Sequence, residues 1–420
     1  MLCLLASAPW ASAQDADDAI PVTPARTYAG LEPFDTMMVD FIRARGIPGA
    51  ALAVTRNGRL ILATGYGWAD RDAREPVRPD SLFRIASASK PITGAAVLRL
   101  IEQYPGKISL DTRVLDVVDV GPPPGSGSTD VRWRDVTIRH LLHHTGGWDR
   151  DTGYDPMFMP LRFARELGIA PPAMPEDIIR CMLGRPLDFD PGTREVYSNF
   201  GYCLLGRVIE RVSGHSYEEY VREEILGPLG ITRMRVGRTL LEGRTDGEVR
   251  YYDPGIGDNV FTEDVDEVAA PYGTFCLEAM DAHGGWIASA VDLVRFACAF
   301  DHPERCPVLA PASVAELFAR PDGPAGYEAD GTAKAAYYAD GWLVRPTADG
   351  RANHWHNGSL PGTYSLLVRR HDGLNWAVIF NQRTCPEGLD VEVIDPALHM
   401  AADAVKRWPG DDLFGTFGAT

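Results

Sequence analysis

The stretch Phe83-Arg-Ile-Ala-Ser-Ala-Ser-Lys90 precedes a run of apolar residues at helical spacing that continues to Ile101. At positions i and i+3 of a helix, Ser87 and Lys90 share one face. An ammonium cannot accept a proton, so Lys90 can act as a base for Ser87 only where burial or a positive field lowers its pKa. A helix N-terminus supplies such a field, and its free N–H groups can hold an oxyanion. The stretch predicts a nucleophilic serine, although a capped surface helix has the same pattern.

Two shorter motifs further along the chain strengthen this interpretation. Tyr197-Ser-Asn199 follows Pro191-Gly192 in a predicted loop and comes just before a helical pattern over 201–212. His356-Asn-Gly-Ser359 precedes a strand-like run over 363–369. The ordered set Ser-x-x-Lys, Tyr-x-Asn and His-x-Gly is far more specific than the first motif alone.

With these motifs the chain resembles the serine β-lactamase and penicillin-binding-protein superfamily. That superfamily contains class C β-lactamases, D-alanyl-D-alanine carboxypeptidase-like proteins and related esterases. The likeness covers about residues 31–408 and includes four longer blocks: Phe83–Lys90, Ile138–Gly147, Pro191–Tyr202 and Gly284–Phe296. The resemblance implies a serine hydrolase that uses no cofactor and no metal.

The resemblance also implies a role for each residue of the first two motifs. Ser87 would be the acylated nucleophile, and Lys90 would take or shuttle its proton. Tyr197 would act as general acid and base toward the leaving group and the hydrolytic water. Asn199 would bind either the substrate's amide or the lysine.

In the third motif, His356 replaces the lysine of a Lys-Thr-Gly sequence. It could donate a hydrogen bond to substrate, with a fractional charge near neutral pH. Gly358 and Ser359 complete the motif, and the backbone N–H groups of Ser87 and Ser359 would form the oxyanion hole. A tyrosine that acts as a base needs a cationic neighbour to lower its pKa, and Lys90 is the candidate within the three motifs.

Predicted strands gather at both ends of the chain, and predicted helices gather in its middle. Asn57-Gly58 between two β-rich runs predicts a hairpin, because both residues tolerate positive φ. Strand patterns return over 341–345, 363–369 and 375–380, before a helical pattern over 395–408. We expect an α+β fold, in which an antiparallel sheet formed from both chain ends is flanked by helices and a mainly helical subdomain is inserted.

The predicted organisation has six consecutive parts. They are a signal peptide (1–13), an unstructured lead-in (14–30), the first part of an α/β subdomain (31–83), a helical subdomain carrying the first two motifs (84–290), the second part of the α/β subdomain carrying His-x-Gly (291–408), and a tail (409–420).

Composition, net charge and apolar runs limit the kinds of protein and partner that fit this chain. The 420 residues are 45% hydrophobic and 24% charged, as in an ordinary globular protein. A net charge of −17 argues against nucleic acid as a partner, because phosphate binding needs clustered Lys and Arg. No run reaches the ~18 apolar residues of a membrane span. The uncharged first 13 residues end in Ala-Ser-Ala, so we expect export to the periplasm or the medium.

Other chemistry-bearing residues fit no motif as well. We expect the six cysteines after Cys3 to be mostly small buried hydrophobes, with Cys298 and Cys306 the first pair to inspect for a disulfide. The cluster His140, His143 and His144 lacks a carboxylate at ligand spacing, which favours packing over metal binding. Three tryptophans beside the family blocks could line the site or pack in the core: Trp148, Trp286 and Trp355.

The sequence leaves three hypotheses about function. The first is hydrolysis of amide bonds in peptidoglycan-type D-amino peptides or β-lactams through an acyl-enzyme on Ser87. The close alternative is a carboxylesterase acting on short-chain esters. The third is a non-catalytic receptor or scaffold, which the intact motifs disfavour. In the first two the partner is a small molecule.

Overall fold

The predicted turn at Asn57-Gly58 closes a hairpin between β2 (Gly49–Arg56) and β3 (Arg59–Asp70). In the computed structural model, which describes residues 19–126, 129–264 and 266–418, Asn57 and Gly58 have φ of 51° and 75°. Positive φ at both turn positions suits the twist of the two strands, and asparagine and glycine adopt it at low cost.

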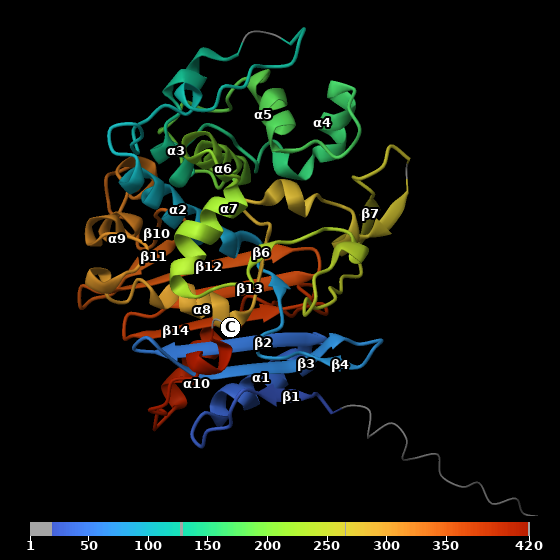
Figure 1. The fold of residues 1–420 in the computed structure, drawn as a ribbon, viewed down its shortest axis with the longest axis vertical. Coiled ribbons are helices and arrows are strands. Elements are labelled where there is room, and N and C mark those ends of the chain that lie inside the picture. The colour runs from blue at the N-terminus through green and yellow to red at the C-terminus, as the bar shows by residue number, and fades with distance from the viewer. Residues whose placement is uncertain (1–18, 127–128, 265, 419–420) are drawn as a thin grey trace, which may run out of the picture.

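The hairpin belongs to a nine-stranded antiparallel sheet to which both chain ends contribute (Figure 1). Its other strands are β1 (Val22–Pro24), β4 (Glu75–Pro76), β10 (Tyr337–Tyr338), β11 (Leu343–Pro346), β12 (Ala352–Leu360), β13 (Thr363–Arg369) and β14 (Leu374–Phe380). The order is β1-β3-β2-β14-β13-β12-β11-β10, with β4 also paired to β3. The two chain ends meet where β14 pairs with β2. The predicted α+β fold is confirmed.

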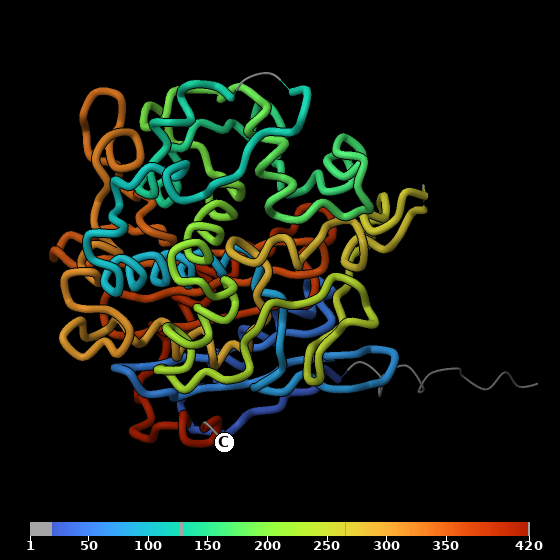
Figure 2. The backbone as a smooth tube through the Cα atoms, turned by 45° about the horizontal axis from the view of Figure 1, so that its top comes forward, coloured from blue at the N-terminus to red at the C-terminus, as the bar shows by residue number. Residues whose placement is uncertain are grey.

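Helices cover both faces of this sheet, and the middle of the chain forms a separate helical region beyond one face (Figures 1 and 2). The helices are α1 (Glu32–Arg45), α2 (Lys90–Gln103), α3 (Ile138–Leu142), α4 (Pro160–Leu167), α5 (Pro175–Leu183), α6 (Asn199–Ser213), α7 (Tyr217–Val221), α8 (Ala290–Cys298), α9 (Pro311–Leu317) and α10 (Ile394–Ala404). Short strands accompany them: β5 (Phe83–Arg84), β6 (Arg235–Val236), β7 (Ile256–Asp258), β8 (Glu267–Ala269) and β9 (Trp286–Ala288).

Alternate side chains of β14 bind the sheet to the two helical layers. Trp376, Val378 and Phe380 lie in one apolar cluster with α1 and α10. Ala377 and Ile379 lie in the other, with α8 and the helical region. Successive strand side chains point to opposite faces, so the continuous apolar run of β14 follows from burial on both sides.

Two expectations about the chain ends need correction. Residues 14–30 are not all unstructured, because Val22–Pro24 form β1 and pair with β3. An edge strand covered on only one side can be polar, so the composition gave no strand signal. The last helix ends at Ala404 rather than 408, since Val405 takes an extended conformation. The predicted signal peptide lies outside the described residues, and within them no helix is long and apolar enough to cross a membrane.

Candidate active site

A pocket of about 540 Å³ opens between the helical region and the end of β12. It brings together residues of all three predicted motifs. Its lining consists of Ser87, His144, Arg150, Asp151, Phe158, Glu195, Tyr197, Asn199, Tyr338, Leu343, His356, Asn357 and Ser359.

A sharp turn presents Ser87 to this pocket. Ala86 has φ of +48°, a left-handed conformation that costs an alanine about 1 kcal/mol, and Ser87 follows it in the short 3₁₀ helix Ala86–Ser89. Residues 81–90 are buried except for Ser87, which is partly exposed. The fold thus holds a strained backbone in place so that one hydroxyl reaches the pocket.

Strand β13 fixes the backbone just before the nucleophile. Thr363 Oγ1 donates to Arg84 O at 2.7 Å, and Ser365 Oγ donates to Ile85 O at 2.6 Å. Both hydroxyls are fully buried. The position of Ser87 is therefore tied to the rigid centre of the sheet.

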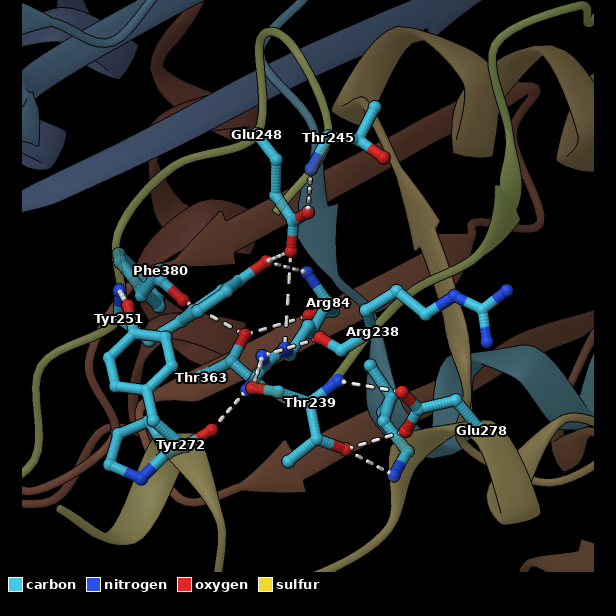
Figure 3. A network of polar contacts seen from close by, with 12 residues as sticks. Arg84, Arg238, Thr239, Thr245, Glu248, Tyr251, Tyr272, Glu278, Thr363 and Phe380 are labelled. Carbon is cyan, nitrogen blue, oxygen red and sulfur yellow. Dashed lines mark hydrogen bonds and ion pairs between the residues drawn. The ribbon is translucent and has the colours of Figure 1, made fainter. Parts of the chain in front are cut away.

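Arg84 ties the same turn to the segment 238–272 (Figure 3). Its fully buried guanidinium donates to three backbone carbonyls, of Pro271 at 2.6 Å and of Arg238 and Thr239 at 2.8 Å each. Its charge is balanced by Glu248, 3.9 Å away. Charge-assisted bonds to carbonyls on a distant segment thus add a second attachment for the turn, besides that to β13.

Gly358 lets β12 touch the nucleophile's turn. A Cβ at this position would lie 2.1 Å from Ile85 O and 2.9 Å from Ser87 N. Any side chain here would push the strand and the turn apart. The glycine of the third motif is therefore a requirement of close packing.

Ser359, the next residue, is placed for the predicted oxyanion hole. Pro361 and Gly362 make a two-residue turn, so Leu360 and Thr363 form a hydrogen-bonded pair of the β12–β13 ladder. Bonded and non-bonded pairs alternate along an antiparallel ladder, which directs the N–H of Ser359 away from β13. Because β11 pairs with β12 only as far as Trp355, that edge is open toward the pocket.

Lys90 is fully buried, and three oxygens surround its amine. Nζ lies 3.2 Å from Ser87 Oγ, 2.7 Å from Asn199 Oδ1 and 2.9 Å from His283 O. Burial holds the pKa of this amine well below its usual range, although the carboxylate of Asp155 opposes the shift. The amine can therefore be neutral near neutral pH and accept the proton of Ser87.

Tyr197 stands beside the same pair, but the expected cation does not act on it. Lys90 Nζ lies 4.7 Å from the centroid of the Tyr197 ring. Burial nevertheless raises the pKa of Tyr197. A hydrogen bond with Ser87 and the charge of Arg150 act in the opposite direction and lower it. The guanidinium carbon of Arg150 is 5.6 Å from the ring centroid. The expectation that Lys90 lowers the pKa of Tyr197 was wrong: the groups that lower it are Ser87 and Arg150, and burial disfavours the charge on Lys90. Tyr197 is a protonated phenol at rest.

Asn199 contacts the lysine, one of its two predicted partners. It is the first residue of α6, whose N-terminus is capped by Ser198 Oγ accepting from Gly201 N at 3.1 Å. Its Oδ1 accepts from Lys90, and its Nδ2 donates to Asp155 Oδ2 at 2.7 Å.

His356 differs from its predicted state. It is buried, Nδ1 lies 2.6 Å from the carbonyl of Asn357, and Nε2 lies 3.0 Å from the hydroxyl of Tyr338. Burial lowers its pKa to about 3. A neutral ring whose Nδ1–H donates to a carbonyl must accept from Tyr338 through Nε2. His356 therefore carries no fractional charge near neutral pH and has no free N–H for a substrate.

Sequence reasoning missed several residues of the pocket. The ring of His144 packs at a tilt against Tyr197 and Tyr338, with centroids 4.4 and 4.2 Å apart, and its Nδ1 accepts from Ser198 N at 3.2 Å. Arg150 pairs with Asp155 at 3.2 Å. The signal for His144 was its place in the block 138–147, but nothing in the sequence linked it to the tyrosines.

The other histidines, the tryptophans and the cysteines singled out in the sequence lie outside the catalytic group. His143 does have a carboxylate partner, Asp340 at 3.0 Å, which is distant in sequence. Trp148 and Trp286 are buried in the core, and the pocket lining contains none of the three tryptophans. Six cysteines are free, including the pair 298 and 306: Cys181, Cys203, Cys276, Cys298, Cys306 and Cys385.

Comparisons with known proteins identify sequences and folds that are similar to this chain. The family model described as Beta-lactamase matches residues 34–393. Esterase EstB of Burkholderia gladioli is 30% identical over 373 residues, which cover 84% of this chain and 91% of that protein.

Solved structures share the fold at lower identity. A D-amino acid amidase from Ochrobactrum anthropi SV3, complexed with L-phenylalanine amide, has a TM-score of 0.65 at 22% identity and covers 89% of this chain and 99% of its own. The octameric penicillin-binding protein homologue from Pyrococcus abyssi has a TM-score of 0.64 at 23% identity, covering 90% and 79%.

Proposed function

The chain belongs to the Beta-lactamase family and is a serine hydrolase, and we propose that it hydrolyses small carboxylic esters through an acyl-enzyme on Ser87. One observation carries the proposal. A hydroxyl and a buried amine that burial can keep neutral lie 3.2 Å apart at the wall of a 540 Å³ pocket. That pair is a nucleophile with its base.

Acylation uses the three motifs in turn. Ser87 Oγ attacks the ester carbonyl while its proton passes to Lys90 Nζ, and the carbonyl oxygen becomes an oxyanion facing the N–H groups of Ser87 and Ser359. The bond from carbon to the leaving oxygen then breaks. Tyr197, a protonated phenol, gives its proton to that oxygen and regains one from Lys90, so the alcohol leaves and both groups return to their resting states.

Deacylation repeats these steps with water. Water attacks the acyl carbon and gives one proton to the same Tyr197 and Lys90 pair, the bond to Ser87 Oγ breaks, and Oγ recovers that proton. The products are the carboxylic acid and the free enzyme. Neither half of the cycle requires a charged histidine.

The state of His356 favours esters over the amide substrates that the sequence suggested first. Peptidoglycan peptides and β-lactams carry a carboxylate, and the lysine of a Lys-Thr-Gly motif would offer it a cation. His356 is buried with its pKa lowered to about 3 and both nitrogens occupied. The third motif therefore supplies no positive charge near neutral pH.

Amide hydrolysis stays as the second candidate because of Arg150. Its side chain is 37% exposed and lines the pocket, so it could pair with a substrate carboxylate in place of the third motif. A D-amino acid amidase that shares the fold also supports amide hydrolysis, independently of any substrate carboxylate.

A comparison of substrates tests the proposal. Short-chain p-nitrophenyl esters, a fluorescent penicillin and D-amino acid amides are each incubated with the wild type and with Ser87→Ala. We expect ester turnover by the wild type, none by Ser87→Ala, and slower or no turnover of the amides and of the penicillin, which carries a carboxylate. Turnover of the penicillin or the amides alone would favour the second candidate, and no turnover of any substrate would refute the proposal.

We also propose that residues 1–13 are removed on export, which the uncharged leader and its Ala-Ser-Ala end support. N-terminal sequencing of the protein recovered from periplasm and medium tests this. A mature chain that begins at Gln14 is expected, whereas an intact Met1 in the cytoplasm would contradict it.

A further inference from the structure

We infer that Asp155 is a positioning residue: its carboxylate fixes the orientation of the Asn199 amide and so directs the lone pair of Lys90 at Ser87. The inference rests on the proposed function and concerns a residue outside the three motifs. In the sequence, Asp149, Asp151 and Asp155 resemble part of a calcium loop, but Pro160 stands at its twelfth position, so the match is incomplete.

The two oxygens of Asp155 have different tasks. Oδ1 accepts from Met157 N at 3.1 Å and caps the short 3₁₀ helix Pro156–Phe158. Oδ2 accepts from Asn199 Nδ2 at 2.7 Å and lies 3.2 Å from Arg150 Nη1. The side chain is 10% exposed. One oxygen therefore holds the loop, and the other faces the active site.

This second oxygen decides which way the amide points. An asparagine side chain has a donating and an accepting end that a half turn interchanges. An ionised carboxylate can only accept, so Nδ2 of Asn199 must face Asp155. The accepting Oδ1 must then face Lys90 Nζ, at 2.7 Å.

The amide orientation in turn directs Lys90. A neutral amine has two N–H bonds and one lone pair. Asn199 Oδ1 at 2.7 Å and His283 O at 2.9 Å carry no proton to donate, so they take both N–H bonds. The lone pair is left for the third neighbour, the hydroxyl of Ser87 at 3.2 Å. A flipped amide would offer its NH₂ to the lone pair and remove the base.

The charges around Lys90 make this arrangement measurable. The carboxylate of Asp155 raises the pKa of Lys90 and the guanidinium of Arg150 lowers it. The other titratable groups that face the amine are Tyr197, Tyr202, His144, His283 and His356. Burial raises the pKa values of the two tyrosines and lowers those of the three histidines, so these groups are uncharged near neutral pH.

Two variants separate the acceptor of Asp155 from its charge. Asp155→Ser retains a hydroxyl that can cap Met157 N but withdraws the acceptor from Asn199. Asp155→Asn retains the shape and removes the charge. We expect kcat/KM for a p-nitrophenyl ester to fall about 100-fold in Asp155→Ser, as for a misplaced catalytic group. The acidic limb of the kcat/KM profile, which reports the base of the free enzyme, should move to lower pH in both variants and to higher pH in Arg150→Met.

A double-mutant cycle separates positioning from a general structural role. If Asp155 acts through Asn199, Asp155→Ser in an Asn199→Ala background should cost little further activity. Where Asp155→Ser does not fold, Asp155→Asn takes its place in the cycle. The matched control is Asp130→Ser, because Asp130 also caps a 3₁₀ helix, at 2.9 Å from Arg132 N, and pairs with an arginine. Its pH profile and kcat/KM should equal those of the wild type.

Additive losses in the cycle, or an acidic limb unmoved in the Asp155 variants, would overturn the inference. Failure of the proposed function is a distinct result, namely a folded wild type that hydrolyses no ester at any pH.

Discussion

Replacing Gly358 by alanine tests whether β12 must touch the turn that carries Ser87. The new Cβ would lie 2.1 Å from Ile85 O, 2.5 Å from Ser365 Oγ and 2.9 Å from Ser87 N. Carbon and oxygen atoms in contact are normally at least about 3.3 Å apart, so the strand and the turn must separate by about 1 Å. Two of the three atoms belong to the backbone and cannot rotate away.

This separation should affect activity more than stability. The N–H groups of Ser87 and Ser359 would no longer converge on one oxyanion, and a displacement of about 1 Å can cost about 100-fold in rate. Overpacking of this kind lowers the free energy of unfolding by about 1–3 kcal/mol. The assays are kcat and KM for a p-nitrophenyl ester, together with urea unfolding.

Gly121→Ala is the matched control, because a Cβ at Gly121 would have no described atom within 4 Å outside its chain neighbours. It should equal the wild type in both assays. A Gly358→Ala variant with wild-type kcat/KM would refute the reasoning that close packing of β12 builds the oxyanion hole.

Three further predictions concern buried groups of the site and its support. Arg84→Met should lower the free energy of unfolding, measured with urea, by about 3–5 kcal/mol, because it leaves Glu248 buried without its charged partner. The double variant Arg84→Met/Glu248→Gln should lose less stability than Arg84→Met alone. A double variant whose loss equals the sum of the two single losses would contradict this. Burial lowers the pKa of His356 to about 3 in the folded chain. Between about pH 6.5 and 3 the unfolded chain therefore binds a proton at this residue that the folded chain does not. The free energy of unfolding should fall as the pH drops through this range, by up to ~1.4 kcal/mol per pH unit from this group. The free energy of unfolding, measured at a series of pH values, should depend less steeply on pH in His356→Gln than in the wild type. Equal slopes would show that His356 does not cause this pH dependence. Tyr197→Phe should reduce kcat for esters by about 10²–10⁴-fold with the thermal midpoint unchanged, and an unchanged kcat would remove the phenol from the mechanism.

The motif residues were predictable because their chemistry depends on short spacings. Ser87 and Lys90 lie one helical turn apart in any helix, and Tyr197 and Asn199 flank the capped start of α6. Local patterns also predicted the hairpin at Asn57-Gly58 and the apolar strands of the sheet. These features follow from the backbone of a few neighbouring residues.

The residues that were missed meet their partners only through the fold. Asp155 lies 44 positions from Asn199, and His143 lies 197 positions from Asp340. No periodicity links residues at such separations. From the sequence alone, the carboxylate of Asp155 fits a fragment of a metal site, and only the fold shows that it contacts the amide of Asn199.

The charge states of the site could not be predicted for a related reason. A sequence shows which groups titrate but not how far each is buried, and burial is the first cause of the shifts at Lys90, Tyr197 and His356. Burial disfavours the charged form of every group. Burial therefore disfavours the charge expected on Lys90 beside Tyr197, and it removes the fractional charge expected on His356.

The titration of Lys90 tests the central claim most directly, and the composition makes it practical. The chain has four lysines, at positions 90, 107, 334 and 406, so NMR of protein labelled with ¹³Cε-lysine should give four resolvable signals. The signal that is lost in Lys90→Met identifies the amine beside Ser87. The account predicts that this signal titrates well below the ordinary lysine pKa of about 10.4, whereas a titration at or above that value would contradict it.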